Sequence, residues 1–325
     1  MARLTGTTVR KAMGGVLAAV LVGACASDRS ERSAPPPTAT TRPTAASAAP
    51  AATPIPEPNP DDPLLVAAGD IACAPGLPVT ATECQHGATA RLVESLEPDV
   101  VAALGDLQYE RGEAAAFAES YDPTWGRFKA RTRPAVGNHE YAGGRASGYF
   151  GYWGDAAHGP GGWYSYDLGA WHVVVLNTVC SVVGCDEGSE QLAWLRADLA
   201  GRAPDRCTLA YFHHPRFTSG LHGPDASVQP LWSALVAAGT DVALSGHDHH
   251  YERIATADGI RQFVVGTGGR STYPVLGRAE GREAVNTTTF GVLALTLRSD
   301  GYDWRFVPIP GSHSGFTDEG SAGCG

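Results

Sequence analysis

The sequence predicts an α/β fold in which mixed β-sheets pack between helices. Through most of the chain, short apolar runs alternate with helix-length segments, which indicates strands joined by helices. Toward the C-terminus the strands follow one another closely, which indicates hairpins and therefore mixed sheets, not a purely parallel one. Several apolar runs also end directly in glycine and polar side chains, as strands do at the ligand-binding edge of α/β sheets.

Strands are predicted where short apolar or β-branched runs end at glycine or polar residues. Two such runs flank Gly169-Ala170 and are expected to form a hairpin. The segment 132–137 directly precedes the pair Asn138-His139. The expected strands are 64–69, 99–104, 163–168, 171–177, 207–212, 241–245, 260–265, 290–297 and 302–307.

Helices are predicted in four segments between these strands, namely 86–97, 113–121, 189–200 and 228–238. The stretch 141–162 is dense in Gly, Tyr and Trp and is expected to be a loop region. Its aromatic part, continuing to Trp163, is a candidate wall for a substrate.

Residues 1–25 are predicted to be a signal peptide, because basic residues precede an apolar stretch, 12–24, that is too short to span a bilayer. The stretch ends in Leu-Val-Gly-Ala before Cys25. This end resembles a bacterial lipobox, in which the cysteine becomes the lipid-bearing N-terminus. An ordinary secretory signal is the alternative. Both interpretations predict an exported bacterial protein, either secreted or held at the cell surface through a lipid on Cys25.

The rest of the chain divides by composition. Residues 26–62 are rich in Pro, Ala and Thr and lack apolar periodicity, so they are expected to form a disordered linker. The folded domain is expected at 63–310, a length that suits one large α/β domain. Residues 311–325 are expected to be a C-terminal tail.

Six cysteines remain beside Cys25, and an even number in an exported chain favours three disulfides. Six cysteines allow 15 pairings, and the sequence does not fix one. We expect local loops closed by two pairs and the C-terminus pinned by the third: Cys73–Cys84, Cys180–Cys185 and Cys207–Cys324. Thiolate metal ligands are the competing interpretation, which is disfavoured because no cysteine lies in the motifs described next.

Four short segments begin with glycine and end in side chains that bind metals. A fifth, His213-His214-Pro215, lies between the third and the fourth. Their order along the chain indicates a hydrolase with two metal ions. The four segments are Gly69-Asp70, Gly105–Tyr109, Gly137–Glu140 and Gly246–His249.

The donor atoms in these motifs suit transition metals. A mixed set of oxygen and imidazole donors fits iron, zinc or manganese and argues against calcium. Seven donors exceed what one ion needs, whereas two ions about 3.5–4 Å apart and sharing a carboxylate would use them all. The candidate ligands are Asp70, Asp106, Tyr109, Asn138, His213, His247 and His249. Successive side chains of a strand alternate in direction, so only one of His213 and His214 is expected to face the site, and His213 is preferred.

This order of residues resembles the calcineurin-like metallophosphoesterases and, within them, the purple acid phosphatase branch. The wider superfamily has Asp-x-His at its first motif, but here the motif is Asp70-Ile71-Ala72. The purple branch also lacks that histidine and has a tyrosine three residues after the second aspartate, which is where Tyr109 lies. Both departures together match the purple branch.

The resemblance implies a four-layer sandwich of two mixed β-sheets flanked by helices. It also implies that Asp70, Asp106, Tyr109 and His249 hold the first metal, and that Asp106, Asn138, His213 and His247 hold the second. A free tyrosine titrates near pH ~10, so a phenolate ligand requires a strongly charged ion. The expected cofactors are therefore Fe3+ at the Tyr109 site and Zn2+, Mn2+ or Fe2+ at the other.

The implied activity is hydrolysis of phosphate monoesters, with metal-bound hydroxide attacking phosphorus in line. The resemblance assigns His139 as a general acid and His222 as a second substrate contact, for which an ordinary surface loop is the alternative. Glu140 is expected to orient the ring of His139, or else to be only a turn residue.

Two other functions remain open, namely hydrolysis of phosphodiesters or nucleotides at the same site, and a non-catalytic lipoprotein that binds metal or phosphate. The expected partner is a small phosphate ester, with membrane contact only through Cys25. The formal net charge of −10 argues against a nucleic-acid partner, which would require a basic face. Bound cations would allow so acidic a protein to hold an anionic substrate.

Overall fold

The computed structural model describes residues 59, 61–312 and 315–325. The expected signal peptide, 1–25, and nearly all of the expected linker, 26–62, lie outside these residues. None of the helices in the described part of the chain has the length and apolar character required to span a bilayer.

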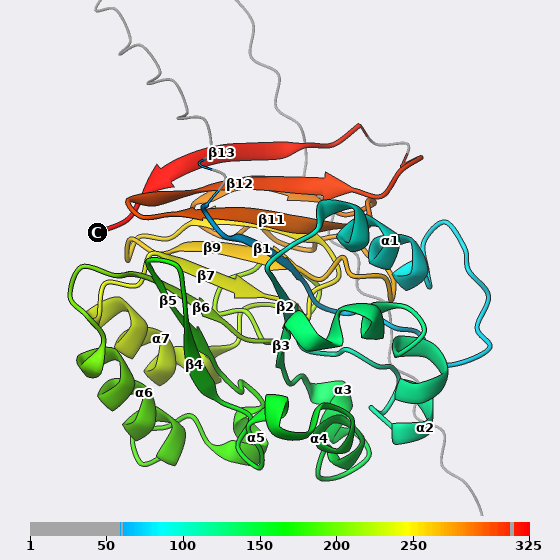
Figure 1. The fold of residues 1–325 in the computed structure, drawn as a ribbon, viewed down its shortest axis with the longest axis horizontal. Helices are drawn as coiled ribbons and strands as arrows, with labels where there is room; N and C mark the ends of the chain where they lie inside the picture. Colours follow the sequence, from blue (N-terminus) through cyan, green and yellow to red (C-terminus); the bar gives the residue numbers. More distant parts are fainter. Residues whose placement is uncertain (1–58, 60, 313–314) are drawn as a thin grey trace, which may run out of the picture. The chain divides into compact units, whose positions relative to one another are not determined.

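Two mixed β-sheets form the folded domain, as the sequence predicts (Figure 1). In spatial order, the first sheet consists of β13 (Asp318–Gly323), β12 (Gly301–Pro308), β11 (Gly291–Arg298), β1 (Leu64–Ala68), β2 (Val100–Leu104) and β3 (Thr132–Ala135). The second consists of β10 (Arg282–Asn286), β8 (Tyr251–Ala255), β9 (Arg261–Val265), β7 (Val242–Ser245), β6 (Cys207–Tyr211), β5 (Trp171–Val175) and β4 (Tyr164–Leu168). Strands β1, β2 and β3 are parallel in the first sheet, as are β5, β6, β7 and β9 in the second.

The two faces of β5 show how the layers pack. Successive side chains of a strand point to opposite faces, so Val173 and Val175 join the core that includes residues of both sheets. Val174 points the other way, into a second apolar cluster that contains Leu192 and Leu235 of two helices. A strand covered on both faces is mostly apolar, and apart from His172 this run is, which is why it is easy to recognise in the sequence.

Helices flank the sheets. α6 (Glu190–Gly201) and α7 (Gln229–Ala237) pack against each other beside the second sheet, and α1 (His86–Leu96) lies next to β11 of the first (Figure 1). The shorter helices are α2 (Ala114–Ala116), the π-helix η1 (Phe117–Tyr121), the 3-10 helices η2 (Trp125–Arg131), η3 (Gly154–Ala157) and η4 (Ala226–Val228), and α3 (Asn138–Tyr141), α4 (Ser147–Trp153) and α5 (Cys180–Val183).

The structure differs from the sequence-based expectation in several segments. The stretch 141–162, expected to be a loop, contains η3 and α4, and the aromatic side chains of α4 pack into the core. The segment 311–325, expected to be a tail, contains β13, which pairs with β12 as an edge strand. Strands β8 and β10 were not predicted. The three disulfides pair as expected.

The topology gathers the polar motifs at one edge. They follow the carboxyl ends of β1, β2 and β3 in the first sheet and of β6 and β7 in the second. Carboxyl ends of parallel strands lie on the same side of a sheet, so each sheet presents its motifs together. Packing of the two sheets then brings both sets into one site.

Candidate metal centre

Three of the candidate ligands have an unusual backbone conformation. Asp70, Asp106 and His247 have φ angles of 60°, 51° and 70°, in the left-handed region that non-glycine residues rarely adopt. Each such residue costs on the order of 1 kcal/mol, and strain of this kind tends to occur at functional sites. Each of the three follows a glycine at the end of a strand, so the chain turns sharply there and directs its side chain into the site.

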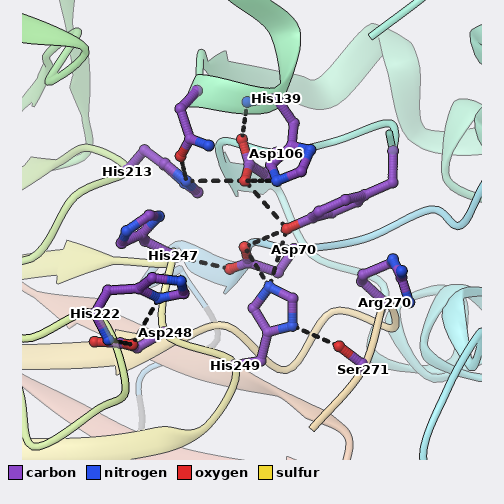
Figure 2. A network of polar contacts seen from close by, with 12 residues as sticks. Asp70, Asp106, His139, His213, His222, His247, Asp248, His249, Arg270 and Ser271 are labelled. Atoms are coloured by element: carbon purple, nitrogen blue, oxygen red, sulfur yellow. Dashed lines mark hydrogen bonds and ion pairs between the residues drawn. The ribbon is translucent and has the colours of Figure 1, made fainter. Parts of the chain in front are cut away.

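The phenol oxygen of Tyr109 is the centre of a first group of donors. The other three members, Asp70, Asp106 and His249, are labelled in Figure 2. The phenol oxygen lies 2.8 Å from Asp70 Oδ1, 3.1 Å from Asp106 Oδ2 and 3.0 Å from Nε2 of His249. The last nitrogen is 3.2 Å from Asp70 Oδ1. All four side chains are nearly or fully buried. The four residues expected at the first metal are therefore together in space.

The hydrogen-bond inventory of this group fits a cation. A phenol has one hydrogen to donate, yet two carboxylate oxygens, which can only accept, lie within hydrogen-bonding distance of the Tyr109 oxygen, together with a ring nitrogen of His249. Burial raises the pKa of Tyr109 well above its usual value, and the carboxylates of Asp106 and Asp70 raise it further. A strongly charged ion among these atoms would stabilise a phenolate and satisfy the remaining lone pairs.

A second group of donors adjoins the first through Asp106. Nε2 of His213 lies 3.1 Å from Asp106 Oδ2 and 3.1 Å from Asn138 Oδ1. The ring of His247 lies 5.1 Å from the ring of His213. Because Asp106 Oδ2 is also 3.1 Å from the Tyr109 oxygen, this single oxygen lies between the two groups. A carboxylate shared by two metal ions requires this position.

The two histidines of the second group differ in their proton affinity. Burial lowers the pKa of His247 to about 2, and the nearby charge of His213 adds to this effect, so His247 is neutral as a ligand must be. Burial also opposes charge on His213, but the Asp106 carboxylate outweighs it and raises the pKa to about 9. The Asp106 carboxylate therefore stabilises positive charge at this position.

Glycines allow these side chains to approach so closely. A Cβ added at Gly246 would lie 2.6 Å from Asp70 Oδ2. One added at Gly105 would lie 2.7 Å from the His213 side chain, and Gly105 also has a φ of +85°. Each of these two glycines therefore leaves room for a candidate ligand from another motif.

His139 projects into the recess above these groups. Its backbone N–H donates to Asp106 Oδ1 at 2.8 Å, and its ring Nδ1 lies 2.7 Å from the carbonyl oxygen of Glu110. That carbonyl can only accept, so Nδ1 carries a hydrogen. Nε2 is left to face the recess, 3.8 Å from Asp106 Oδ2. The recess has a volume of about 220 Å³, and His222 also lines it.

His222 reaches the same recess from the loop after β6. Its Nδ1 lies 3.1 Å from Asp248 Oδ1 and 3.1 Å from the phenol oxygen of Tyr273. Its ring lies 4.3 Å from that of His247. The hydrogen bond to Asp248 raises the pKa of His222, although partial burial opposes it.

Glu140 has a different position from the one expected. Its carboxylate does not contact the ring of His139 but accepts hydrogen bonds from four backbone N–H groups. Consecutive residues of α3 point in different directions, so one faces the recess and the other faces inward. Glu140 therefore fixes the loop that carries Asp106. The four donors are the N–H groups of Asp106, Leu107, Gln108 and Gly137, at 2.8–3.2 Å.

His214 lies closer to the site than expected. Ring nitrogens of His213, His214 and His247 lie within 4.8 Å of one another. Strand alternation was the basis for excluding His214, but β6 ends at Tyr211 and alternation does not extend past it. Its backbone N–H donates to Thr178 Oγ1 at 2.8 Å, which turns this residue toward a neighbouring pocket.

Arg270 is a residue of the recess that the motifs did not indicate. Its guanidinium lies over the Tyr109 ring, 5.3 Å from the centroid, and Nη2 donates to Glu110 at 2.8 Å. Its Nε is buried and has no hydrogen-bond partner among the described residues. A lone arginine outside any motif carries no signal in a single sequence, since its position depends on sheet packing.

Comparison with known proteins gives the family context. The sequence profile of the calcineurin-like phosphoesterases matches residues 64–251, which is more than half of the chain. Probable inactive purple acid phosphatase 9 of Arabidopsis thaliana is 25% identical over 237 residues, or 55% of this chain and 35% of that protein. This chain therefore spans about a third of the length of that relative.

Solved structures share the fold at low sequence identity. Purple acid phosphatase PPD1 from yellow lupin (Lupinus luteus) has a TM-score of 0.59 and 19% identity, covering 79% of this chain and 53% of that chain. A dimetal phosphatase from Danio rerio has a TM-score of 0.59 and 15% identity, covering 81% of this chain and 100% of that chain. Two mixed sheets flanked by helices are common to all three.

Proposed function

The chain belongs to the calcineurin-like phosphoesterase family, and we propose that it hydrolyses phosphate monoesters with two metal ions, in the manner of the purple acid phosphatases. The convergence of Tyr109 with Asp70, Asp106 and His249 carries this proposal. A structural tyrosine would need one acceptor for its hydrogen. Two buried carboxylates and an imidazole nitrogen around one phenol oxygen support a phenolate bound to a cation.

The proposed ligands follow the two groups of donors. Asp70, Tyr109 and His249 hold the first ion, which we propose is Fe3+. Asn138, His213 and His247 hold a divalent ion, Zn2+, Mn2+ or Fe2+, and Asp106 is shared. When bound, such ions would supply a nucleophile from water near neutral pH and neutralise charge on the phosphate oxygens.

The protein's own groups would act on the leaving group. Nε2 of His139 faces the recess, and the Glu110 carbonyl fixes the orientation of the ring. A protonated His139 can therefore donate to the ester oxygen as the bond to phosphorus breaks. His222 has a raised pKa and lies across the same recess, where its charge favours the transition state.

Export is the second part of the proposal. Three disulfides are typical of chains that fold in an oxidising compartment. Together with the predicted signal sequence, they support a secreted or surface-anchored protein. We propose the domain limits expected from composition, with the folded domain continuing through β13.

The test uses the purified chain from residue 63 onward. We expect two metal ions per chain, a visible charge-transfer band from the phenolate, and turnover of p-nitrophenyl phosphate. Faster turnover of bis-p-nitrophenyl phosphate would assign the site to diesters instead. His139→Ala is expected to retain the metals and lose about 100-fold in kcat. A protein that binds two metals but turns over neither ester would be a binding protein, and the proposal would be wrong.

A further inference from the structure

A larger pocket adjoins the recess at the second group of ligands. Its volume is about 690 Å³, within the range that binds small organic molecules. Asn138 lines both the pocket and the recess, and His214 lines the pocket with its ring 4.4 Å from that of His247. The pocket therefore begins at the proposed second metal and is placed to receive the organic part of a bound ester.

The walls of the pocket are well supported. One wall is the loop around α5, which the Cys180–Cys185 disulfide closes. The other is the start of η4, where Asp225 accepts a hydrogen bond from the Ser227 N–H at 2.8 Å. Asp186 in the first wall accepts one from the Gly188 N–H at 2.9 Å. Within the part of the chain that the structure describes, neither carboxylate accepts a further hydrogen bond.

The charged side chains that line the pocket are all acidic. Among the described residues that line it, Asp186 and Asp225 are carboxylates and none is lysine or arginine. The metal end of the site attracts a phosphate, whereas this end repels a second anion and attracts a cation. The two ends together are complementary to a molecule with a phosphate at one end and a positive charge at the other.

We propose that the preferred substrates are phosphate monoesters of amino alcohols, whose ammonium group occupies the pocket beside Asp186 and Asp225. Phosphate monoesters of uncharged alcohols would be hydrolysed less efficiently, and esters with a second anionic group would be poor substrates. This inference rests on the proposed phosphatase function and specifies its leaving group.

The test compares three esters that differ only in the charge of the end group, namely 2-aminoethyl, propyl and 2-carboxyethyl phosphate. With the metal-loaded enzyme we expect kcat/KM to fall in that order, with about tenfold or more between the first and the last. The double variant Asp186→Asn, Asp225→Asn should bring that ratio close to one and leave propyl phosphate within about twofold. Asparagine keeps both backbone hydrogen bonds, so the walls should fold normally.

Asp205→Asn is the matched control, because Asp205 is an exposed aspartate outside the pocket, and its ratio should equal that of the wild type. A wild-type ratio near one, or a ratio unchanged in the double variant, would overturn the inference while hydrolysis of p-nitrophenyl phosphate upheld the proposed function. Failure to hydrolyse any of these esters would overturn both.

Discussion

The carboxylate of Asp248 accepts two hydrogen bonds from His222, one from the backbone N–H and one from ring Nδ1, each at 3.1 Å. The other oxygen accepts from Thr218 Oγ1 at 2.8 Å. In the motif His247-Asp248-His249 the two histidines face the metal centre, and the aspartate between them faces the loop that carries His222. One short segment thus orients candidate ligands and a candidate substrate contact at the same time.

Replacing Asp248 with Asn should weaken the orientation and the charge of His222. The hydrogen bond to Asp248 raises the pKa of His222. Without this bond His222 should lose its proton at lower pH, so the alkaline limb of the activity profile should move to lower pH. We expect kcat to fall about tenfold, measured with p-nitrophenyl phosphate across pH.

The control for this prediction is metal content, because Asp248 lies between two candidate ligands. The variant should retain as much metal as the wild type. An unchanged pH profile with normal metal content would mean that Asp248 does not act through His222.

Tyr109→Phe should remove the phenol oxygen at the centre of the first group. Three buried donors would then face an apolar ring edge, so the first metal should bind at least about 10-fold more weakly. Loss of the visible band and of one metal ion per chain, measured on the same sample, checks the prediction.

Tyr273→Phe is the matched control for Tyr109→Phe. Tyr273 also lines the recess, but its oxygen contacts His222 and the carbonyl of His247, not the carboxylates. This variant should keep both the metal and the colour. A Tyr109 variant that kept its colour would exclude a phenolate ligand at this position.

The strands and the motifs that follow them were predictable, because both are local in sequence. A buried parallel strand is a continuous apolar run, and the ligands come directly after it. The distances among Asp70, Asp106 and Tyr109 follow from the neighbouring parallel positions of β1 and β2, which only the structure shows.

Features that depend on tertiary pairing were not predictable. β13 is rich in small and polar residues and has no strand periodicity, yet β12 provides its hydrogen bonds and Cys207–Cys324 fixes its end. Arg270 reaches the recess only because its loop pairs with residues after β1. The backbone N–H of Arg270 donates a hydrogen bond to the carbonyl oxygen of Asp70. No pattern in one sequence records such contacts.

Glu140→Gln should destabilise the whole edge of the first sheet. The carboxylate accepts four N–H groups, whereas a glutamine amide has one acceptor oxygen and would turn an NH2 group toward the remaining donors. We expect the free energy of unfolding to fall by about 3 kcal/mol, measured by denaturant unfolding of the metal-free protein.

Glu190→Gln is a matched control for the loss of a carboxylate. Glu190 is exposed in the first turn of α6, so its replacement should change stability by only about 0.5 kcal/mol. Equal effects of the two variants would show that the backbone contacts of Glu140 contribute nothing specific.

His172 should make stability depend on pH far from the metal centre. Its Nε2 lies 2.8 Å from Asp198 of α6, and Nδ1 lies 3.0 Å from Asp167 of β4. The hydrogen bond to Asp198 raises the pKa of His172 above 6.5, although burial opposes it. Burial would raise the pKa of Asp198, but its bonds to His172 and Ser165 lower it below 3.8.

The sign of the effect follows from these two shifts. A raised histidine pKa means that the folded protein binds the proton more tightly, so the stabilisation is complete below pH 6.5 and is lost as pH rises through the folded pKa. The lowered pKa of Asp198 gives stabilisation above pH 3.8 that is lost in stronger acid. The pair therefore stabilises most between these values, by about 1 kcal/mol. Unfolding of the wild type and His172→Gln should differ by this amount near pH ~5.5 and converge at higher pH, whereas a constant difference would mean that His172 contributes packing, not charge.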